Sequence, residues 1–397
     1  MEQDWASLPK HLLDLTLGKL GSFTDYIQFG AVCIRWHSIL IDNPNKQNEL
    51  MRHHQVPVLL FPGKEEDTWS IYNITNNKFL ELKLSLSYKR RFSGSSEGWL
   101  VIGNKDHTVT LHKPDFIDYK VENSQLANYE SIDLPCLFDP PDEEDDLDPE
   151  ILEYFGEEAY DYRIAKALIT ADPLINPDNC TIFMIFGGYN EIAFRRYKKD
   201  TEWVRIADRH YDDIIHYKNN FYAVDYSGRL VSFNIDDPST IKLVTPKILN
   251  LTSVAHVKRY LVESCTGELL QVERFVRMDE DLKRWTTIFK VYGLNMDFDH
   301  EGIRWIETKS LGGAALFVGD NSSISVLASG GFQWNCQPNC IYFTHDDVSI
   351  NASKGSDMGI YNVETGSFEL HFAMDPTTFS RIFDRPPIWV VPIPNKY

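Results

Sequence analysis

Residues 221–233 read FYAVDYSGRLVSF, and this stretch decides the fold expected for most of the chain. Two short apolar runs flank a turn in which Gly228 can take the positive φ angle that tight hairpin turns require. The same arrangement recurs at residues 260–272, with Gly267 in the turn. The two glycines are 39 residues apart (267 − 228). The sequence therefore predicts a series of β-hairpins with a regular spacing.

Further hairpins are expected on the N-terminal side of this pair. Residues 69–82 and 98–112 each hold two strand-like runs separated by a turn that contains Asn. Residues 71–79 also share a template with residues 360–368, at opposite ends of the region. A repeat near the propeller period of about 40–50 residues, over about 320 residues, predicts a mainly β chain with a C-terminal β-propeller of about seven blades. The alternative is a pair of β-sandwiches, which would not produce the same template at both ends of the region.

The pattern is different in residues 5–41, where apolar side chains recur at helical spacing on more than one face. Gly21-Ser22 separates two helical segments, which together would form a small hairpin. A unit of about 40 residues seldom buries enough surface to fold alone. So many apolar side chains on so small a unit indicate a surface left over for a partner.

The order of residues in this helical unit resembles the F-box motif. Leu8-Pro9 is followed by Leu12-Leu13, and Val32-Cys33 is followed by Arg35-Trp36, with Trp36 at the expected distance from Cys33. Arg35 directly precedes Trp36, which shifts the basic position by one residue. The resemblance implies a surface for a Skp-family adaptor. It assigns to that surface the residues Leu8, Pro9, Leu12, Leu13, Leu20, Val32, Cys33 and Trp36. The alternative is an ordinary helical cap on the next domain.

The remainder of the chain resembles plant F-box proteins that carry a KIB-type β-propeller. The resemblance rests on blocks that occur in the family's order. These blocks are 98–101, 221–225, 311–320, 323–326, 339–344 and 386–392. The resemblance implies a propeller over most of residues 55–397, and residues 139–158 depart from its pattern. We expect a helical F-box domain at 4–44, a linker at 45–55 and the propeller at 56–397.

Residues 139–158 contain eleven carboxylates and no Lys or Arg, so this segment is expected to be a solvated acidic insert. It lacks the residue spacing of a calcium-binding loop. Residues 151–155 could form a short helix. An inert surface loop is the favoured interpretation, and electrostatic attraction of a basic target segment is the alternative.

Composition excludes several classes of function. A net charge of −19 argues against a nucleic-acid-binding surface, which needs clustered Lys and Arg. No apolar run approaches the ~20 residues that span a bilayer, and no signal peptide is expected. Six scattered cysteines form no disulfide framework and fit a reducing compartment, so we expect a protein of the nucleus, the cytoplasm or both.

Three motifs have chemical interpretations that the sequence does not favour. Residues 94–98 match the nucleophile motif G-x-S-x-G around Ser96, but a strand is expected after the serine where the motif requires a helix, so a solvent turn is favoured. Cys336, Cys340 and His345 fall short of the four ligands of a structural zinc site, and the cysteines are expected to be buried. The glycine pairs 187–188 and 312–313 lack the sequence that follows a phosphate loop and are expected to be turns or sites of close packing.

Together these features predict a non-enzymatic substrate receptor of an SCF-type ubiquitin ligase. As the F-box resemblance implies, the helical unit would bind a Skp-family adaptor and, through it, cullin and RING subunits, while the propeller would hold an unknown protein target. No catalytic, cofactor-binding or metal-binding residue is assigned. A scaffold that recruits the adaptor outside a ligase, or a propeller enzyme, remains an alternative.

Overall fold

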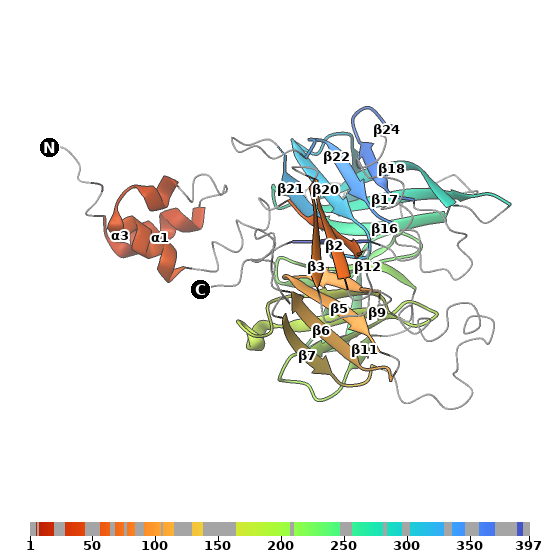
Figure 1. Cartoon of the computed structure of the whole chain (residues 1–397), viewed down its shortest axis with the longest axis horizontal. Coiled ribbons are helices and arrows are strands. Elements are labelled where there is room, and N and C mark those ends of the chain that lie inside the picture. The colour runs from red at the N-terminus through yellow and green to blue at the C-terminus, as the bar shows by residue number, and fades with distance from the viewer. Residues whose placement is uncertain are drawn as a thin grey trace. The chain divides into compact units, whose positions relative to one another are not determined.

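The computed structural model forms two compact units, residues 1–56 and 57–397 (Figure 1). It describes residues 5, 8–19, 28–43, 56–63, 68–74, 78–83, 91–104, 106–114, 129–137, 164–206, 210–246, 256–280, 284–295, 302–328, 336–345, 357–369 and 387–391. The acidic insert 139–158 lies outside these residues. Across them, no helix has the length and apolar character needed to cross a membrane.

The first unit is helical. Helix α1 covers Lys10–Lys19 and helix α3 covers Ile34–Asp42, with a single helical turn at 28–31 between them. Cys33 is the N-cap residue of α3 and is extended, with φ −166° and ψ 169°, so the helical turn at 28–31 does not continue into α3.

In the described residues, the second unit consists of six sheets, which we number as blades in chain order. Blade 1 contains β1 (Val58–Pro62), β2 (Thr68–Asn73), β3 (Lys78–Lys83) and β25 (Ile388–Val390). Blade 2 contains β4 (Gly94–Ser96), β5 (Trp99–Gly103), β6 (Val109–Pro114) and β7 (Tyr129–Leu134). Blade 3 contains β8 (Ile164–Ile169), β9 (Thr181–Phe186), β10 (Glu191–Arg196) and β11 (Val204–Ile206), with a 3-10 turn at Pro177–Asn179.

The last three blades are built in the same way, with one exception. Blade 4 contains β12 (Tyr211–Tyr217), β13 (Asn220–Asp225), β14 (Leu230–Asn234) and β15 (Asp237–Thr245). Blade 5 contains β16 (His256–Glu263), β17 (Leu269–Met278), β18 (Arg284–Asn295) and β19 (Arg304–Thr308). Blade 6 contains β20 (Ala314–Val318), β21 (Ile324–Leu327), β22 (Cys340–Phe343), β23 (Gly359–Asn362) and β24 (Ser367–Glu369). In blade 6, β20 and β22 pair in parallel, whereas the other strand pairs are antiparallel.

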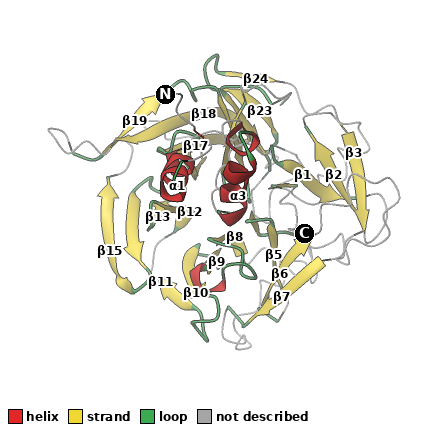
Figure 2. Ribbon diagram, turned by 90° about the vertical axis from the view of Figure 1, so that its left-hand side faces the viewer, coloured by secondary structure: helices red, strands yellow, loops and turns green. Residues whose placement is uncertain are grey.

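The blades are arranged in a circle, with one strand of each at the centre (Figure 2). β4, β8, β12 and β16 each contact the next central strand, and β21 and β25 complete the set. Apolar clusters fill the spaces between neighbouring blades. Burial of this kind is the main favourable contribution to folding. The expectation of a β-propeller is therefore confirmed.

The ring closes where the last strand joins the first blade. β25 pairs antiparallel with β1, so that Leu59 lies opposite Trp389. The Trp389 ring also packs against blade 6, with centroid distances of 5.0 Å to Phe317 and 6.4 Å to Tyr342. Closure covers the inner edge of β1, which would otherwise be exposed.

The expected blade number of about seven is wrong, because the described residues form six. The estimate assumed a uniform period, and the later blades are longer. Blade 4 extends over 211–245, whereas blade 5 extends over 256–308 because β17 and β18 reach beyond their neighbours. Blade 6 holds an extra strand and extends over 314–369. The added length accounts for the residues that a uniform period would place in a seventh blade.

The predicted hairpins are present, and the template shared by residues 71–79 and 360–368 has a structural counterpart. Tyr72 lies opposite Phe79 across β2 and β3, with ring centroids 4.8 Å apart. Tyr361 lies opposite Phe368 across β23 and β24, with ring centroids 4.9 Å apart. The repeated template thus encodes the same cross-strand aromatic pair in the outer hairpins of blades 1 and 6.

Candidate interaction surfaces

The helical unit has a small core of five buried side chains. Leu13 and Leu17 are four residues apart in α1 and therefore share a face, and Ile39 and Leu40 approach them from α3. Phe29 completes the core, and Leu8 and Trp36 pack at its edge. A salt bridge of 2.6 Å between Lys10 and Asp42 ties the two helices together at the surface.

The residues assigned to the adaptor surface divide between this core and the exterior. Leu13 is fully buried, and Leu8, Cys33 and Trp36 are partly buried. Pro9 is exposed, and the exposed fractions of Leu12 and Val32 are 39% and 53%. Leu20 lies outside the described residues.

Trp36 has a role inside the helical unit. Its ring lies 4.6 Å from that of Phe29, and its Nε1 donates a hydrogen bond of 3.2 Å to the carbonyl of Trp5. These contacts hold the start of the chain against α3. Removing Trp36 would therefore disturb the fold of the unit as well as any surface that the unit presents.

Four further apolar side chains are exposed on the helical unit, and the motif had not assigned them to a surface. They are Trp5 at 62%, Leu15 at 60%, Ile34 at 91% and Ile41 at 68%. The signal was present in the sequence, because the apolar positions of residues 5–41 cover more than one face of each helix. An isolated unit this small cannot bury them all, and exposed apolar side chains gathered on one unit are typical of a partner surface.

The propeller has buried ion pairs that join one blade to another. Lys113 pairs with Asp172 at 2.6 Å, Lys166 with Asp213 at 2.7 Å and Arg274 with Asp357 at 3.0 Å. Arg91, just before β4, pairs with Asp320 of blade 6 at 2.7 Å and donates to the carbonyl of Ile164 in blade 3. A buried charge is tolerated only when it is paired in this way, so these contacts fix how the blades lie against one another.

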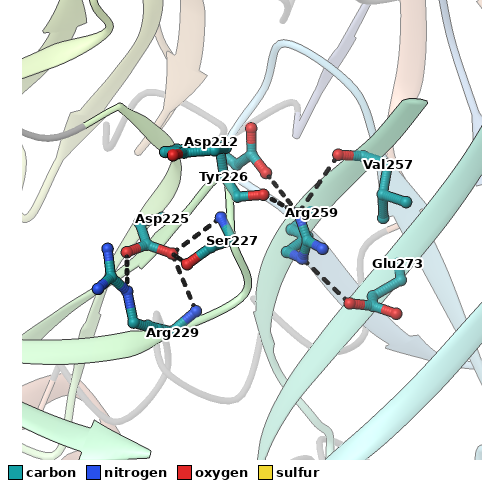
Figure 3. Close-up of polar contacts among 8 residues, drawn as sticks. All are labelled: Asp212, Asp225, Tyr226, Ser227, Arg229, Val257, Arg259 and Glu273. Carbon is teal, nitrogen blue, oxygen red and sulfur yellow. Dashed lines mark hydrogen bonds and ion pairs between the residues drawn. The ribbon is translucent and has the colours of Figure 1, made fainter. Parts of the chain in front are cut away.

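Arg259 occupies the space between blades 4 and 5 (Figure 3). Its Nε donates to Glu273 at 3.0 Å, and its Nη1 donates to the Tyr226 carbonyl at 2.6 Å and to Asp212 at 3.4 Å. Burial raises the pKa of Asp212, although the nearby positive charges of Lys258 and Arg259 oppose this effect. These contacts make Arg259 a structural link that holds the turn containing Tyr226.

The turn itself is organised by Asp225. Its carboxylate accepts hydrogen bonds from the Ser227 hydroxyl at 2.6 Å and from the backbone N–H groups of Ser227 and Arg229. The Arg229 side chain donates to the other carboxylate oxygen at 2.6 Å (Figure 3). Gly228 takes φ +82°, as the hairpin turn requires. Tyr226 therefore projects from a rigid turn, with 63% of its side chain exposed.

Comparison with known proteins identifies the propeller. A family model described as the KIB1-4 β-propeller matches residues 71–362, more than half of the chain. The chain belongs to the KIB1-4 β-propeller family. The similar proteins of Arabidopsis thaliana include F-box protein At2g17036, which is 27% identical, and F-box protein SKIP23, which is 25% identical. Each alignment covers 98% of this chain and 95% of the relative. The predicted resemblance to plant F-box proteins with a KIB-type propeller is confirmed.

In the KIB1-4 propeller, Ser96 has a structural role. Ser96 ends β4, and its hydroxyl donates a hydrogen bond of 2.7 Å to the carbonyl of Ile169 in blade 3. Glu97 and Gly98 then form a turn with φ 54° and 78°, and β5 follows. The helix that a nucleophile motif requires is replaced by a strand. The predicted turn is present, but Ser96 itself is buried between two blades and not in solvent.

The cysteines of the KIB1-4 propeller include the pair expected in its core. Cys336 and Cys340 are both buried, and burial raises the pKa of each thiol to about 11, so both remain protonated at neutral pH. All six cysteines of the chain are described, and none of them forms a disulfide bond. Within the described residues, no group of three or more His, Cys, Asp or Glu side chains is arranged to hold a metal ion.

Proposed function

We propose that this protein is the substrate-recognition subunit of an SCF-type ubiquitin ligase. The helical unit would bind a Skp-family adaptor and, through it, cullin and RING subunits, and the propeller would hold the target protein. The chain would act by proximity, since it raises the local concentration of target lysines near the ubiquitin-charged enzyme without catalysing a reaction itself. Its six free thiols favour a reducing compartment, and we propose the nucleus, the cytoplasm or both.

One observation carries this proposal: the helical unit leaves a set of apolar side chains exposed that its five-residue core cannot bury. Leu12 and Val32 belong both to the F-box pattern and to this exposed set. The relatives named as F-box proteins support the proposal, because they align with nearly all of the chain.

The test is adaptor capture by a double variant, Leu12→Asp with Val32→Asp. Both side chains lie outside the five-residue core, so the helical core should remain intact. Two carboxylates placed in an apolar interface should weaken binding to a purified Skp-family adaptor by about a hundredfold or more. The matched control is His37→Ala, an exposed polar position of the same unit, which should bind as the wild type does.

Equal capture of the double variant and the wild type would refute the F-box assignment. Cullin separates the ligase from the alternative scaffold, because a substrate receptor must bring cullin into the complex through the adaptor. Purification of the chain with adaptor and without any cullin would favour the scaffold.

A further inference from the structure

Three exposed aromatic side chains form a continuous row across blades 3 and 4. Tyr189 lies in the turn between β9 and β10, His210 precedes β12, and Tyr226 lies in the turn between β13 and β14. The Tyr189 and His210 rings are 5.3 Å apart at 84°, and the His210 and Tyr226 rings are 5.5 Å apart at 74°. Such edge-to-face contacts hold the row in place without burying it. The exposed fractions of Tyr189 and Tyr226 are 69% and 63%.

Backbone hydrogen bonds fix these three segments to one another. The Tyr211 N–H donates to the Asn190 carbonyl at 3.1 Å, and the Tyr226 N–H donates to the His210 carbonyl at 2.9 Å. The row is therefore a property of the rigid ring and not of three independent turns. Large aromatic side chains on a rigid support contribute much of the energy in protein interfaces, because they bury a large area at low entropic cost.

The row continues onto blade 5 through Arg259. Its Nη1 donates both to the Tyr226 carbonyl at 2.6 Å and to the Val257 carbonyl at 3.4 Å, and so joins the two backbones (Figure 3). Val257 lies opposite Phe275 in β17, and Phe275 lies opposite Ile288 in β18. Cross-strand partners point to the same face of a sheet. The half-buried Val257 and the exposed Ile288 therefore extend the apolar surface.

Trp285 lies at the end of this surface. It is opposite Arg277, which is two residues beyond Phe275 and shares its face. Trp285 and Ile288 each have 40% of their side chains exposed. β17 and β18 are 10 and 12 residues long, and this length presents both side chains at the outer part of the hairpin. We call the combined surface the aromatic band, defined by Tyr189, His210, Tyr226, Val257, Trp285 and Ile288.

Among the described residues, three acidic side chains between blades 4 and 5 are buried, whereas two arginines near the band reach the surface. The side chains of Asp225 and Glu273 are fully buried and that of Asp212 is 9% exposed, and all three are held by Arg229 or Arg259. By contrast, the Arg229 side chain is 37% exposed and Arg277 is exposed beside Trp285. The exposed carboxylates of Asp279 and Glu280 lie past Met278, at the tip of the hairpin. Arg229 and Arg277 therefore place guanidinium groups beside the band in a chain whose net charge is −19.

We propose that the aromatic band is the target-binding surface of the propeller, and that it takes an acidic segment of a partner protein. Apolar side chains of that segment would pack on the tyrosine rings and on Trp285, and its carboxylates would pair with Arg277 and Arg229 at the rim. Aromatic side chains supply the affinity and the guanidinium groups supply charge selectivity. The inference rests on the proposed function, since it names the class of target for a substrate receptor.

A defined acidic polymer can serve as the probe. The full chain, purified with a Skp-family adaptor, is titrated into a fluorescein-labelled copolymer of glutamate and tyrosine, and binding is followed by fluorescence anisotropy. The wild type should bind this copolymer. Because the pairs at the rim are exposed, the affinity should fall as salt is raised from low to physiological ionic strength.

The variants test the band directly. Tyr226→Ala removes the ring but keeps the carbonyl that Arg259 binds, so the fold should be preserved. Combined with Trp285→Ala it should weaken copolymer binding about tenfold or more. Arg277→Glu should weaken binding and reduce its salt dependence. The matched control is Leu174→Ala, an exposed apolar side chain between β8 and β9, at the other end of blade 3 from Tyr189, which should bind as the wild type does.

Adaptor capture distinguishes the failure of this inference from the failure of the proposed function. Band variants that bind the copolymer as tightly as Leu174→Ala does would overturn the inference, as would a wild type that does not bind the copolymer. In each of these cases intact adaptor capture would leave the proposed function standing. If Leu12→Asp with Val32→Asp captures adaptor normally while band-dependent copolymer binding persists, the band still binds acidic segments but the ligase assignment falls.

Discussion

At the scale of single residues, Asp225 shows how one buried carboxylate can set the position of an exposed side chain. It accepts hydrogen bonds from Ser227 and Arg229, which follow Tyr226 in the turn, so the ring of Tyr226 is presented from a fixed backbone. Burial alone would raise the pKa of Asp225. The hydrogen bonds from Ser227 and Arg229 outweigh this effect and hold the pKa below its ordinary value.

The depressed pKa of Asp225 predicts a stability that depends on pH. A group whose pKa is lower in the folded state contributes stability above its unfolded pKa of about 4 and loses it as the pH falls through the folded value. Asp225→Asn should lower the free energy of unfolding at pH 7 by roughly 1–3 kcal/mol, because it removes a charged acceptor. The difference between wild type and variant should shrink as the pH is lowered toward about 3.

Chemical denaturation at a series of pH values measures this difference. Asp236→Asn is the matched control, because Asp236 also pairs with an arginine but its side chain is 76% exposed. It should change the free energy of unfolding by less than about 0.5 kcal/mol at any pH. A constant difference between wild type and Asp225→Asn from neutral to acid pH would contradict the pKa argument.

At the scale of secondary-structure elements, β25 has a role that its three residues do not suggest. Both of its neighbours come from distant parts of the chain, since β1 pairs with it and blade 6 packs on Trp389. Trp389 is fully buried at this seam. Truncation after Arg385 should expose the edge of β1 and the aromatic surface of Phe317, and so should give insoluble or unfolded protein.

Thermal melting and solubility of the truncated chain check this expectation. A chain that begins at residue 57 and keeps β25 is a suitable comparison, because the propeller is a compact unit without the helical residues. A truncated protein that melts at the same temperature as the full chain would mean that the last strand is dispensable.

Several elements of the fold could be predicted from the sequence, and the reason is local. The hairpin at 221–233 combines alternating apolar residues with a glycine in the turn, and both signals act over a few neighbouring residues. The Tyr–Phe template at 72–79 and 361–368 encodes a cross-strand pair for the same reason. Nothing in the local sequence predicts the parallel pairing of β20 with β22, because the pairing depends on which non-adjacent strand lies beside β20.

The interaction surfaces were predictable only in part. The F-box pattern marks which residues are distinctive, but it does not separate Leu13 in the core from Leu12 outside it. That distinction depends on the phase of α1 against α3. The aromatic band could not be predicted, because Tyr189, His210 and Tyr226 come from three separate loop segments. They lie close together because blades 3 and 4 pack against each other, and patterns in a single sequence do not predict that packing.

At the scale of the whole molecule, charge is unevenly distributed along the chain. The acidic insert 139–158 holds eleven of the carboxylates and lies outside the described residues, between β7 and β8 in sequence. If it is a solvated loop, deleting residues 139–148 should leave the melting temperature nearly unchanged. Loop length changes closure entropy by only about 0.6 kcal/mol per doubling, and the loss of self-repulsion should stabilise the protein slightly.

Thermal melting of the deletion variant tests the solvated-loop interpretation, and a large fall in melting temperature would mean that the segment carries structure. Salt dependence tests the alternative role. If the insert attracts a basic target, association of labelled polylysine should slow between low and physiological ionic strength, and the deletion should flatten that slope. Parallel slopes for the two proteins would rule out electrostatic steering by the insert.

The pairing of β25 with β1 also constrains how the protein is made. The ribosome produces β1 before any other strand of the propeller, and its partner only after the remaining blades have emerged. Until then the nascent chain carries an unpaired edge and a solvent-exposed seam, the features that promote misassociation of folding intermediates. Joining residues so far apart is also a slow step, because the entropy of the intervening chain must be lost first. Synthesis of this protein therefore includes an interval in which chaperones would protect an incomplete ring.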